Sequence, residues 1–387
     1  MDGEACGFRR CELRSKNVDT IKRFFECLLP VTVCNLECEY CYVIQENRRQ
    51  MQLAQLKYSP EHIAKALRKG RVGGVCLISI CGAGETLVQR EAVDIAALLL
   101  KEGHYVNITT NGTLSQRFDD LITKAGDAID RLHVSFSLHY IELLKKGWVD
   151  CFFDNVCKMR KAGASILVQM NLCDAYVPYI DEIKRISMER VGAWPQVALT
   201  RDELKRPFKI YTSGSKEAYL QQGKRFNSPL FDFTAKNFEV KRKEFCYAGE
   251  WSGVLDLESG ILKRCYCEHG GTNIFEDINS PIEFCPVGKA CRAEYCVNSS
   301  HFMSLGVIPS IQTPSYSQLR NRPDAAWQTD VMAHFLNTRL YENNRQYSLR
   351  EMRKLERDDR KLRLCEKLYQ NRFYQLLSRV KAKLLRR

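Results

Sequence analysis

The sequence predicts an α/β fold in which six strand–helix units form a parallel sheet that closes part way into a barrel. Two observations predict it. Between residues 31 and 200, short apolar segments rich in Val and Ile alternate with segments of helical character, as buried parallel strands alternate with crossover helices. The strand candidates also recur at intervals of about 30 residues, the length of one βαβ unit. Six such strands fit a partial TIM-like barrel better than a two-layer sandwich.

The elements follow in order along this region. The strand candidates are residues 31–33, 74–81, 105–110, 132–138, 166–171 and 196–200. One helix is predicted to begin at Ser59, an N-cap residue followed by Pro60, and to end at Gly70. Another is predicted over residues 88–102 and ends at Gly103.

The same patterns divide the chain into five parts. We expect an N-terminal extension over residues 1–24 and the barrel over 25–205, followed by a polar, basic connector over 206–245. Residues 246–305 are rich in Cys and Gly with little periodicity, which favours a small fold held by metal. A loop with several prolines and a basic helical tail complete residues 306–387.

The composition excludes several classes of protein. The chain has 387 residues, 45% of them hydrophobic and 27% charged, which argues against extensive disorder. No apolar run approaches the roughly 20 residues that a membrane span needs. The charged N-terminus lacks the apolar segment of a secretory signal, so a cytoplasmic protein is expected. Its 18 cysteines have little use as disulfides in a reducing cytosol, and their clustering indicates metal.

The first cysteine group directly follows the first strand candidate. Cys34, Cys38 and Cys41 have the spacing C-x3-C-x2-C. Three thiolates at this spacing can hold a cubic iron–sulfur cluster and leave its fourth iron without a protein ligand. Catalytic metal sites keep such an open position. The alternative, a structural zinc site, needs a fourth nearby Cys or His, and none occurs from Tyr42 to Tyr58.

With Tyr40 before its last cysteine, this motif resembles the signature of the radical S-adenosylmethionine (radical SAM) superfamily. The resemblance covers roughly residues 25–200 and implies a catalytic 4Fe-4S cluster whose open iron chelates S-adenosylmethionine, with the aromatic residue near the adenine. Further segments after successive strands are similar to those with which the family binds the nucleoside. They are Gly82, Gly84 and Glu85 after the second strand, Thr110 and Asn111 after the third, and Ser135 and Ser137 on the fourth.

The resemblance also implies a reaction. An electron from a donor such as flavodoxin or ferredoxin enters the cluster and cleaves S-adenosylmethionine, and the resulting 5′-deoxyadenosyl radical abstracts hydrogen from a substrate carbon. The protein's part is to position that carbon and to exclude water. Loops at the carboxyl ends of barrel strands suit this task.

The second cysteine group resembles the C-terminal auxiliary-cluster extension called SPASM, or its shorter form called twitch. Cys246, Gly260 and Cys265 match the start of that pattern, whereas the second half departs from it. We expect one auxiliary 4Fe-4S cluster with Cys246, Cys265, Cys291 and Cys296 as its leading ligands. Cys285 or Cys267 could substitute, or could ligate a second, incomplete cluster. A zinc ribbon is the alternative.

Five side chains after the strands or after Cys246 are candidates for a base or hydrogen donor, although a plain loop role is the commoner one. They are His139, Tyr140, Cys173, Asp174 and Glu250. The auxiliary cluster would either accept an electron from a substrate radical or bind the substrate, and the sequence does not choose between these roles.

The substrate stays open between two classes. Enzymes with this extension often oxidise, crosslink or epimerise peptides or proteins, and this is the favoured function. Peptide-modifying members commonly carry a leader-binding domain before the cysteine motif, and the 33 residues that precede Cys34 leave no room for one unless a separate partner supplies it. The alternative is a dehydrogenase or epimerase of a sugar or another small molecule. A more distant alternative is a non-enzymatic protein that binds metal and nucleic acid, which leaves the ordered loop matches unexplained.

The tail carries most of the excess charge. Residues 348–387 hold 14 Lys and Arg against 5 Asp and Glu. Apolar residues from Leu362 to Leu384 recur at steps of three and four, which predicts an amphipathic helix. Such a helix could lie on an anionic membrane surface, pack on the barrel, or dock onto an acidic partner.

Overall fold

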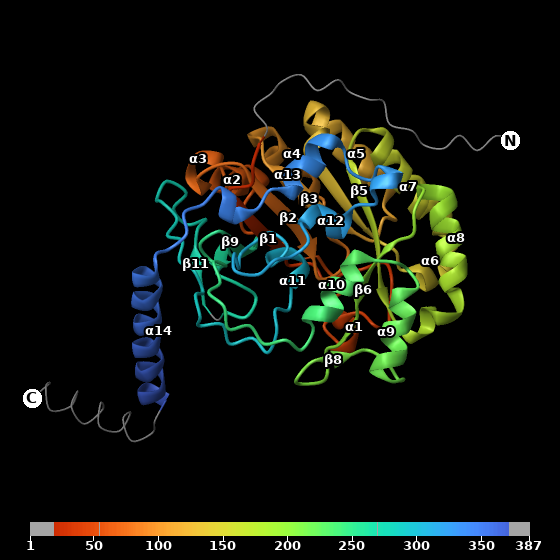
Figure 1. Ribbon diagram of the computed structural model, residues 1–387. Coiled ribbons are helices and arrows are strands. Elements are labelled where there is room, and N and C mark those ends of the chain that lie inside the picture. The colour runs from red at the N-terminus through yellow and green to blue at the C-terminus, as the bar shows by residue number, and fades with distance from the viewer. Residues whose placement is uncertain (1–18, 54, 269, 371–387) are drawn as a thin grey trace, which may run out of the picture.

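A nine-stranded, largely parallel sheet organises the protein (Figure 1). The computed structural model describes residues 19–53, 55–268 and 270–370. Six strands are parallel neighbours in chain order, from β1 inside the sheet to β6 at one edge. They are β1 (Arg23–Leu29), β2 (Cys76–Gly82), β3 (Tyr105–Thr110), β4 (Leu132–Ser137), β5 (Ser165–Leu172) and β6 (Gln196–Leu199). The predicted α/β fold with a partial parallel barrel is confirmed.

The first strand was predicted at the wrong place. It spans Arg23–Leu29, and residues 31–33 form an extended loop after it. Arg23 and Glu26 interrupt the apolar run that identifies a buried strand, and Pro30, which has no N–H to donate, follows the strand's last residue. The loop still pairs, because Gly84 N donates to Val31 O over 2.6 Å.

One layer of helices covers one face of the sheet. These helices are α2 (Pro60–Ala66), α4 (Glu91–Glu102), α5 (Ser115–Ala125), α7 (Val149–Lys161) and α8 (Ile180–Val191). Outward-facing strand residues such as Phe25, Ile78 and Val134 belong to the core that they share with these helices. Ser59 caps α2 as predicted. That helix ends at Ala66, before the predicted Gly70, and a separate short helix α3 (Lys69–Val72) follows.

The second predicted helix is also shorter than its apolar pattern. A 3-10 turn, η1 (Thr86–Val88), precedes α4, so the helix begins at Glu91 rather than at Val88. Gly103 ends it with a φ of +92°, a backbone conformation that favours glycine.

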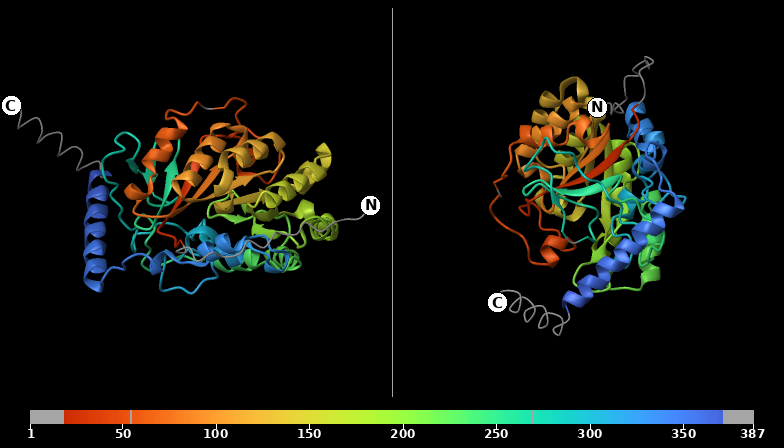
Figure 2. Two further views of the ribbon diagram at one scale, coloured as in Figure 1. Left: turned by 90° about the horizontal axis from the view of Figure 1, so that it is seen from above. Right: turned by 90° about the vertical axis from the view of Figure 1, so that its left-hand side faces the viewer.

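The opposite face of the sheet, the barrel interior, is covered by helices from the C-terminal part of the chain. In Figure 2 the sheet lies between the two sets of helices. The covering elements are α10 (Pro229–Asn237), α11 (Ser299–Phe302), α12 (Tyr316–Arg320) and α13 (Asp330–Asn337). Tyr105 stacks on Phe335 with ring centroids 3.6 Å apart, and Phe24 meets Phe302 edge to face. This packing fills the interior at one end of the strands and leaves the other end for a cavity.

Two segments predicted as a connector and a loop contain helices. The connector over 206–245 holds α9 (Lys216–Lys224) and α10, which begin after the N-caps Ser215 and Ser228. The proline-containing stretch holds α12 and α13, capped by Ser315 and Thr329. These helices have nine residues or fewer, too few for a clear apolar period, which is why the pattern missed them.

The Cys-rich region is not a separate small fold. Its strand β9 (Ser252–Asp256) pairs in parallel with β1, and β10 (Ile261–Lys263) and β11 (Thr272–Asn273) continue the same sheet. Trp251 and Tyr247 stack 3.7 Å apart in an apolar core that also contains Phe24 of β1. Strand pairing and apolar packing therefore join this region to the barrel. A hairpin of β7 (Arg201–Asp202) and β8 (Lys209–Ile210) stands apart from the main sheet.

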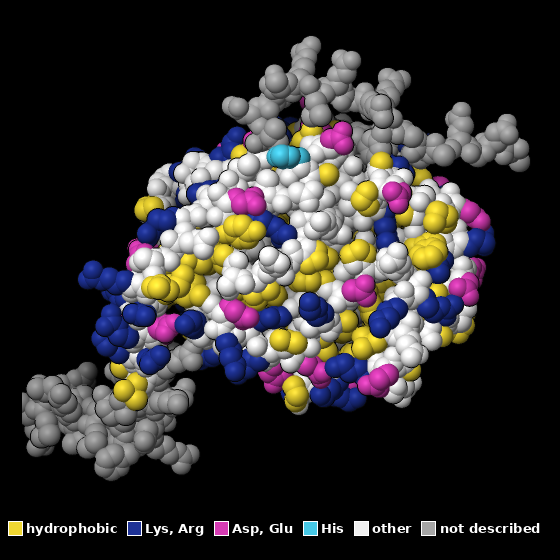
Figure 3. Space-filling model, in the orientation of Figure 1, with side chains coloured by type: hydrophobic (Ala, Val, Ile, Leu, Met, Phe, Trp, Pro, Cys, Tyr) yellow, Lys and Arg dark blue, Asp and Glu magenta, His cyan; other side chains and the backbone are white. Residues whose placement is uncertain are grey.

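The tail helix α14 (Leu349–Gln370) projects from the body of the protein (Figures 1 and 2). Met352 and Leu355 pack against the core that Phe245 and Trp251 belong to. Lys and Arg side chains gather on the exposed side of this helix (Figure 3). The predicted apolar positions from Phe373 to Leu384 lie outside the described residues, as do residues 1–18 of the N-terminal extension. None of the helices within the described ranges is long and apolar enough to cross a membrane.

Candidate active site

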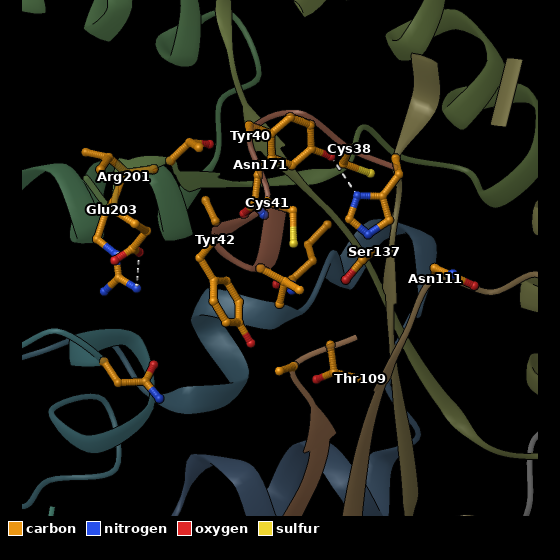
Figure 4. A pocket seen from close by; sticks show the side chains of 18 of the residues that line it. Cys38, Tyr40, Cys41, Tyr42, Thr109, Asn111, Ser137, Asn171, Arg201 and Glu203 are labelled. Atoms are coloured by element: carbon orange, nitrogen blue, oxygen red, sulfur yellow. Dashed lines mark hydrogen bonds and ion pairs between the residues drawn. The ribbon is translucent and has the colours of Figure 1, made fainter. Parts of the chain in front are cut away.

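A cavity of about 390 Å³ lies at the carboxyl ends of the parallel strands. Most of the predicted cofactor-binding side chains meet there, and Figure 4 shows several of them around one space. Of the residues predicted from the sequence, the cavity is lined by Cys34, Cys38, Cys41, Tyr40, Gly82, Gly84, Glu85, Thr110, Asn111, Ser137, His139 and Cys296.

The three cysteines occupy the loop between β1 and the short helix α1 (Tyr42–Gln45). Backbone Leu36 N donates to Cys34 Sγ over 3.4 Å, and Asn111 Nδ2 lies 3.8 Å from the same sulfur. Burial raises the pKa of Cys34 to about 11 and raises that of Cys38 further. Thiols that face one cavity and receive N–H donors fit an iron–sulfur cluster, whose thiolates N–H donors stabilise.

The described residues do not form a three-ligand site for a single metal ion, as distinct from a cluster. Among them, no three His, Cys, Asp or Glu side chains come close enough together to hold a single metal ion.

The glycine-rich segment after β2 lies against the start of the cysteine loop. Gly84 N bonds Val31 O, and Glu85 N donates to Val33 O over 2.9 Å. A Cβ at Gly84 would stand 2.1 Å from Val33 O, so this position admits no side chain. The missing side chain at Gly84 therefore lets the loop after β2 contact the start of the cysteine loop.

Glu85 is buried and its carboxylate is occupied by the protein. Oε1 accepts from Thr110 Oγ1 at 2.7 Å and from Leu87 N at 2.9 Å, and Oε2 accepts from Asn111 N at 2.7 Å. Burial raises the pKa of this carboxyl. Asn111 in turn donates to Asn35 Oδ1 over 2.7 Å, inside the cysteine motif. Glu85 thus positions the ends of β2 and β3 relative to the cysteine loop.

Tyr40 and His139 are joined across the cavity wall. Tyr40 Oη lies 2.6 Å from His139 Nδ1 and 3.0 Å from Tyr176 Oη. Burial lowers the pKa of His139 to about 4, so its imidazole is neutral at neutral pH. With Nδ1 engaged by Tyr40, the ring's other nitrogen is the one free to act on a bound molecule.

A buried polar layer lies beneath the cavity, deeper in the barrel. Ser79 Oγ donates to Glu26 Oε1 at 3.0 Å, and Asn107 Nδ2 donates to Ser79 Oγ at 3.1 Å. Ser135 Oγ and His133 Nδ1 both contact Asn107 Oδ1, at 2.8 and 2.7 Å. Ser135, predicted to contact the nucleoside, therefore belongs to this layer, whereas Ser137 lines the cavity.

Of the five candidates for a base or hydrogen donor, His139 alone is among the residues that line the cavity. Tyr140 and Cys173 are buried in the core. Asp174 accepts from Thr212 Oγ1 and from Ser213 and so fixes the loop after β8. Glu250 Oε2 accepts from Tyr347 Oη at 3.1 Å.

Several cavity residues were not predicted from the sequence. The ion pair of Arg201 and Glu203, 2.9 Å long, stands at one side of the cavity (Figure 4). Asn298, His301 and Arg320 enter from the C-terminal segments that cover the barrel interior. Asn298, His301 and Arg320 follow no strand and belong to no recognisable motif, so only the fold brings them to the site.

A second cavity, of about 40 Å³, collects the cysteines of the C-terminal group. The cysteines that line it are Cys246, Cys265, Cys267, Cys291 and Cys296. Burial raises the pKa of Cys246 to about 12, whereas the hydrogen bond from Cys267 lowers that of Cys265. Cys285 is exposed and is not among the lining residues. The four leading ligands expected from the sequence thus face one space.

The two cavities share a wall. Residues 295–298 line both of them, and Cys296 is the cysteine common to the two. Tyr295 contributes a buried ring to this wall. A group bound by the C-terminal cysteines would therefore lie one residue layer away from a molecule in the larger cavity.

Comparison with known families gives a match over part of the chain. Residues 28–172 match the family model described as Radical SAM superfamily, so this part of the chain is a radical SAM domain. The match begins at the end of β1 and ends at the end of β5. It therefore contains the cysteine loop, the Gly82–Glu85 segment and His139.

Particular proteins resemble parts of the chain. A probable GTP 3′,8-cyclase of Methanothermobacter thermautotrophicus is 34% identical over 104 residues, which are 27% of this chain and 32% of that protein. Streptococcus suis SuiB bound to its precursor peptide SuiA is 16% identical, with a TM-score of 0.47 over 67% of this chain and 64% of SuiB. The enzyme anSMEcpe bound to S-adenosylmethionine and a peptide is 15% identical, with a TM-score of 0.45 over 66% of this chain and 79% of that one.

Proposed function

We propose that this protein is a radical SAM enzyme in which Cys34, Cys38 and Cys41 hold a 4Fe-4S cluster. The convergence of these three thiols on one cavity with the Gly82–Glu85 segment, Asn111 and His139 carries the proposal. When bound, the cluster and S-adenosylmethionine supply a 5′-deoxyadenosyl radical that abstracts hydrogen from a substrate carbon.

The chain's own residues shape the proposed site for the cluster and S-adenosylmethionine and orient the His139 ring. Gly84, with no side chain, lets the loop after β2 approach the cysteine loop, and Glu85 fixes that loop to β3. Tyr40 lies in the motif where the family's aromatic residue meets the adenine, and its hydroxyl holds the His139 ring in place. Neutral His139 is then placed to donate or accept one hydrogen bond, or to take a proton, at its free nitrogen.

The helices over the barrel interior close the far end of the cavity. Phe302 and Tyr316, packed against Phe24, exclude water from that end. A radical formed in such an enclosed space meets the substrate rather than solvent.

The C-terminal cysteines are proposed to hold an auxiliary 4Fe-4S cluster. Cys246, Cys265, Cys291 and Cys296 remain its proposed ligands, with Cys267 as the substitute that the shared cavity favours over Cys285. The wall of residues 295–298 supports a role close to the substrate, either as an electron acceptor or as a binding group. The electron donor for the catalytic cluster is proposed to be a flavodoxin or a ferredoxin.

The favoured substrate is a peptide or protein, modified by oxidation, crosslinking or epimerisation. A second candidate, a sugar or another small molecule, is favoured by the cavity itself, since neutral polar side chains such as Ser137, Gln169 and Asn171 line it from successive strands. Such side chains suit hydroxyl groups. A short precursor peptide encoded beside this gene would favour the first candidate, and genes of sugar metabolism would favour the second.

Electron paramagnetic resonance tests the cluster assignment. The anaerobically reconstituted protein, reduced with dithionite, should give a 4Fe-4S signal that changes when S-adenosylmethionine is added, because the open iron gains ligands. The Cys34→Ala, Cys38→Ala, Cys41→Ala triple variant should lose the response to S-adenosylmethionine. A colourless protein that binds zinc and gives no such signal would contradict the proposal.

A further inference from the structure

Arg320, the last residue of α12, is a nearly fully buried cation on the floor of the larger cavity. Its side chain is 2% exposed and lines the cavity. Nη1 donates to Ser300 O over 2.8 Å, and the guanidinium carbon lies 3.6 Å from the centre of the Tyr316 ring. These two contacts fix the direction of the guanidinium.

This guanidinium lacks an ion-pair partner within the part of the chain that the structure describes. Glu26 is the acidic side chain whose charge acts on it. The carboxylate of Glu26 is already engaged, since it accepts from Ser79 and Cys81 and lies 3.0 Å from His301 Nδ1. Arginine stays protonated in proteins and carries several N–H donors, so most of this group's donor capacity remains unused.

The floor also carries two further hydrogen-bonding side chains. Asn298 and His301 line the same cavity beside Arg320. Both also reach Glu26: Asn298 Nδ2 lies 3.4 Å from Oε2, and the contact of His301 is close but poorly aligned. A buried cation among such groups is stabilised when an anion binds beside it and forms an ion pair with it.

The floor lies deeper in the barrel than the cysteine loop. Glu26 is paired in register with Ser79, three residues before Gly82 at the end of β2. At about 3.3 Å per residue, this places the polar layer roughly 10 Å along the strand from the loop segment at Gly82. A molecule held on the floor would therefore occupy the interior beneath a nucleoside bound at the mouth.

We propose that Arg320, assisted by Asn298 and His301, binds a carboxylate or phosphate group of the substrate. The proposal rests on the proposed function, because it takes the molecule in the barrel interior to be the substrate of the radical SAM domain. An oxyanion matches the planar donor fork of arginine. The site would hold one end of the substrate while the carbon to be attacked faces the cysteine loop.

Calorimetric titration of the full-length protein with inorganic phosphate and, separately, with acetate tests this site at constant ionic strength. We expect saturable binding of at least one anion, weakened tenfold or more in Arg320→Gln and partly recovered in Arg320→Lys. Arg185→Gln on the exposed side of α8 removes one positive charge elsewhere and should bind as the parent does. Preference for phosphate indicates a phosphorylated substrate, and preference for acetate indicates a carboxylated one.

Two results would overturn the proposal. One is equal anion binding by the parent and by Arg320→Gln. The other is loss of anion binding at saturating S-adenosylmethionine, which would assign the guanidinium to the carboxylate of that nucleoside. If Arg320→Gln fails to fold, crystals of the parent soaked in selenate decide: an anomalous peak at hydrogen-bond distance from the Arg320 guanidinium supports the site, and its absence there contradicts it.

The titration needs no turnover. A protein that binds the anion through Arg320 but forms no 5′-deoxyadenosine would refute the proposed function and keep the anion site.

Discussion

The hydroxyl of Tyr40 lies 2.6 Å from Nδ1 of His139, and this contact joins the cysteine motif to the residue that follows β4 by two positions. Tyr176, whose hydroxyl lies 3.0 Å from that of Tyr40, extends the contact into a chain of three polar groups. The orientation of the cavity's neutral imidazole therefore depends on a residue of the cysteine loop. A change in that loop would therefore alter the orientation of the His139 ring.

Tyr40→Phe should lower the free energy of unfolding by about 1–3 kcal/mol, because it removes one hydroxyl and leaves half-buried His139 and buried Tyr176 without this hydrogen-bond partner. Urea denaturation measures this change. Tyr58→Phe is the matched control, since Tyr58 is half-buried and contacts its neighbours through its ring. An equal effect of the two substitutions would contradict the role assigned to the Tyr40 hydroxyl.

Gly84→Ala should lower the free energy of unfolding by about 1–3 kcal/mol and weaken binding of S-adenosylmethionine, because the new Cβ would collide with Val33 O. Gly70→Ala provides the comparison. Gly70 lies in α3 with no atom within 4 Å of the added Cβ, so this change should be neutral or stabilise by up to about 1 kcal/mol. Normal nucleoside binding by Gly84→Ala would show that the loop tolerates a side chain.

His104 gives a prediction for the pH dependence of stability. Its Nδ1 accepts from Cys76 N at 3.1 Å, its Nε2 bonds Leu67 O at 2.9 Å, and burial lowers its pKa to about 4 from its ordinary value of 6.5. As the pH falls, His104 takes up a proton in the unfolded chain before it does so in the folded protein. The stability that neutral His104 contributes is therefore present in full above pH 6.5 and is lost progressively towards pH 4. The loss attributable to His104 is about 3 kcal/mol.

Urea denaturation of the parent and of His104→Gln at several pH values checks this. The stability of the parent should fall more steeply than that of the variant between pH 6.5 and pH 4, whereas His334→Gln, at an exposed position, should follow the parent. Parallel pH profiles for the parent and His104→Gln would contradict the assignment.

Iron analysis distinguishes the proposed ligands of the auxiliary cluster from Cys285. Cys285 is exposed and outside the smaller cavity, whereas Cys296 is half-buried and lines that cavity. Cys285→Ala should therefore keep the iron content of the parent, about eight per chain for two 4Fe-4S clusters, and Cys296→Ala should retain about four. Iron lost from Cys285→Ala and kept in Cys296→Ala would reverse the assignment.

Much of the barrel could be predicted because its central strands are continuous apolar runs bounded by turns, as at β3 and β4. β1 was not predicted at its true position because Glu26 interrupts its apolar run. This residue accepts a hydrogen bond from Ser79 in the buried polar layer. The cysteine, glycine and asparagine residues of the site could also be predicted, because they lie in short sequence motifs in the loops that follow the strands. Asn298, His301 and Arg320 could not be found in this way, because long-range packing of α11 and α12 into the barrel brings them to the cavity.

Formation of 5′-deoxyadenosine tests the central claim most directly. The reconstituted protein, incubated anaerobically with S-adenosylmethionine and dithionite, should release 5′-deoxyadenosine, measured by liquid chromatography and mass spectrometry. The triple variant Cys34→Ala, Cys38→Ala, Cys41→Ala should release none above background while keeping about four irons per chain in the proposed auxiliary site. If the parent, loaded with iron and sulfide, forms no more 5′-deoxyadenosine than the triple variant, the cavity is not a radical SAM active site.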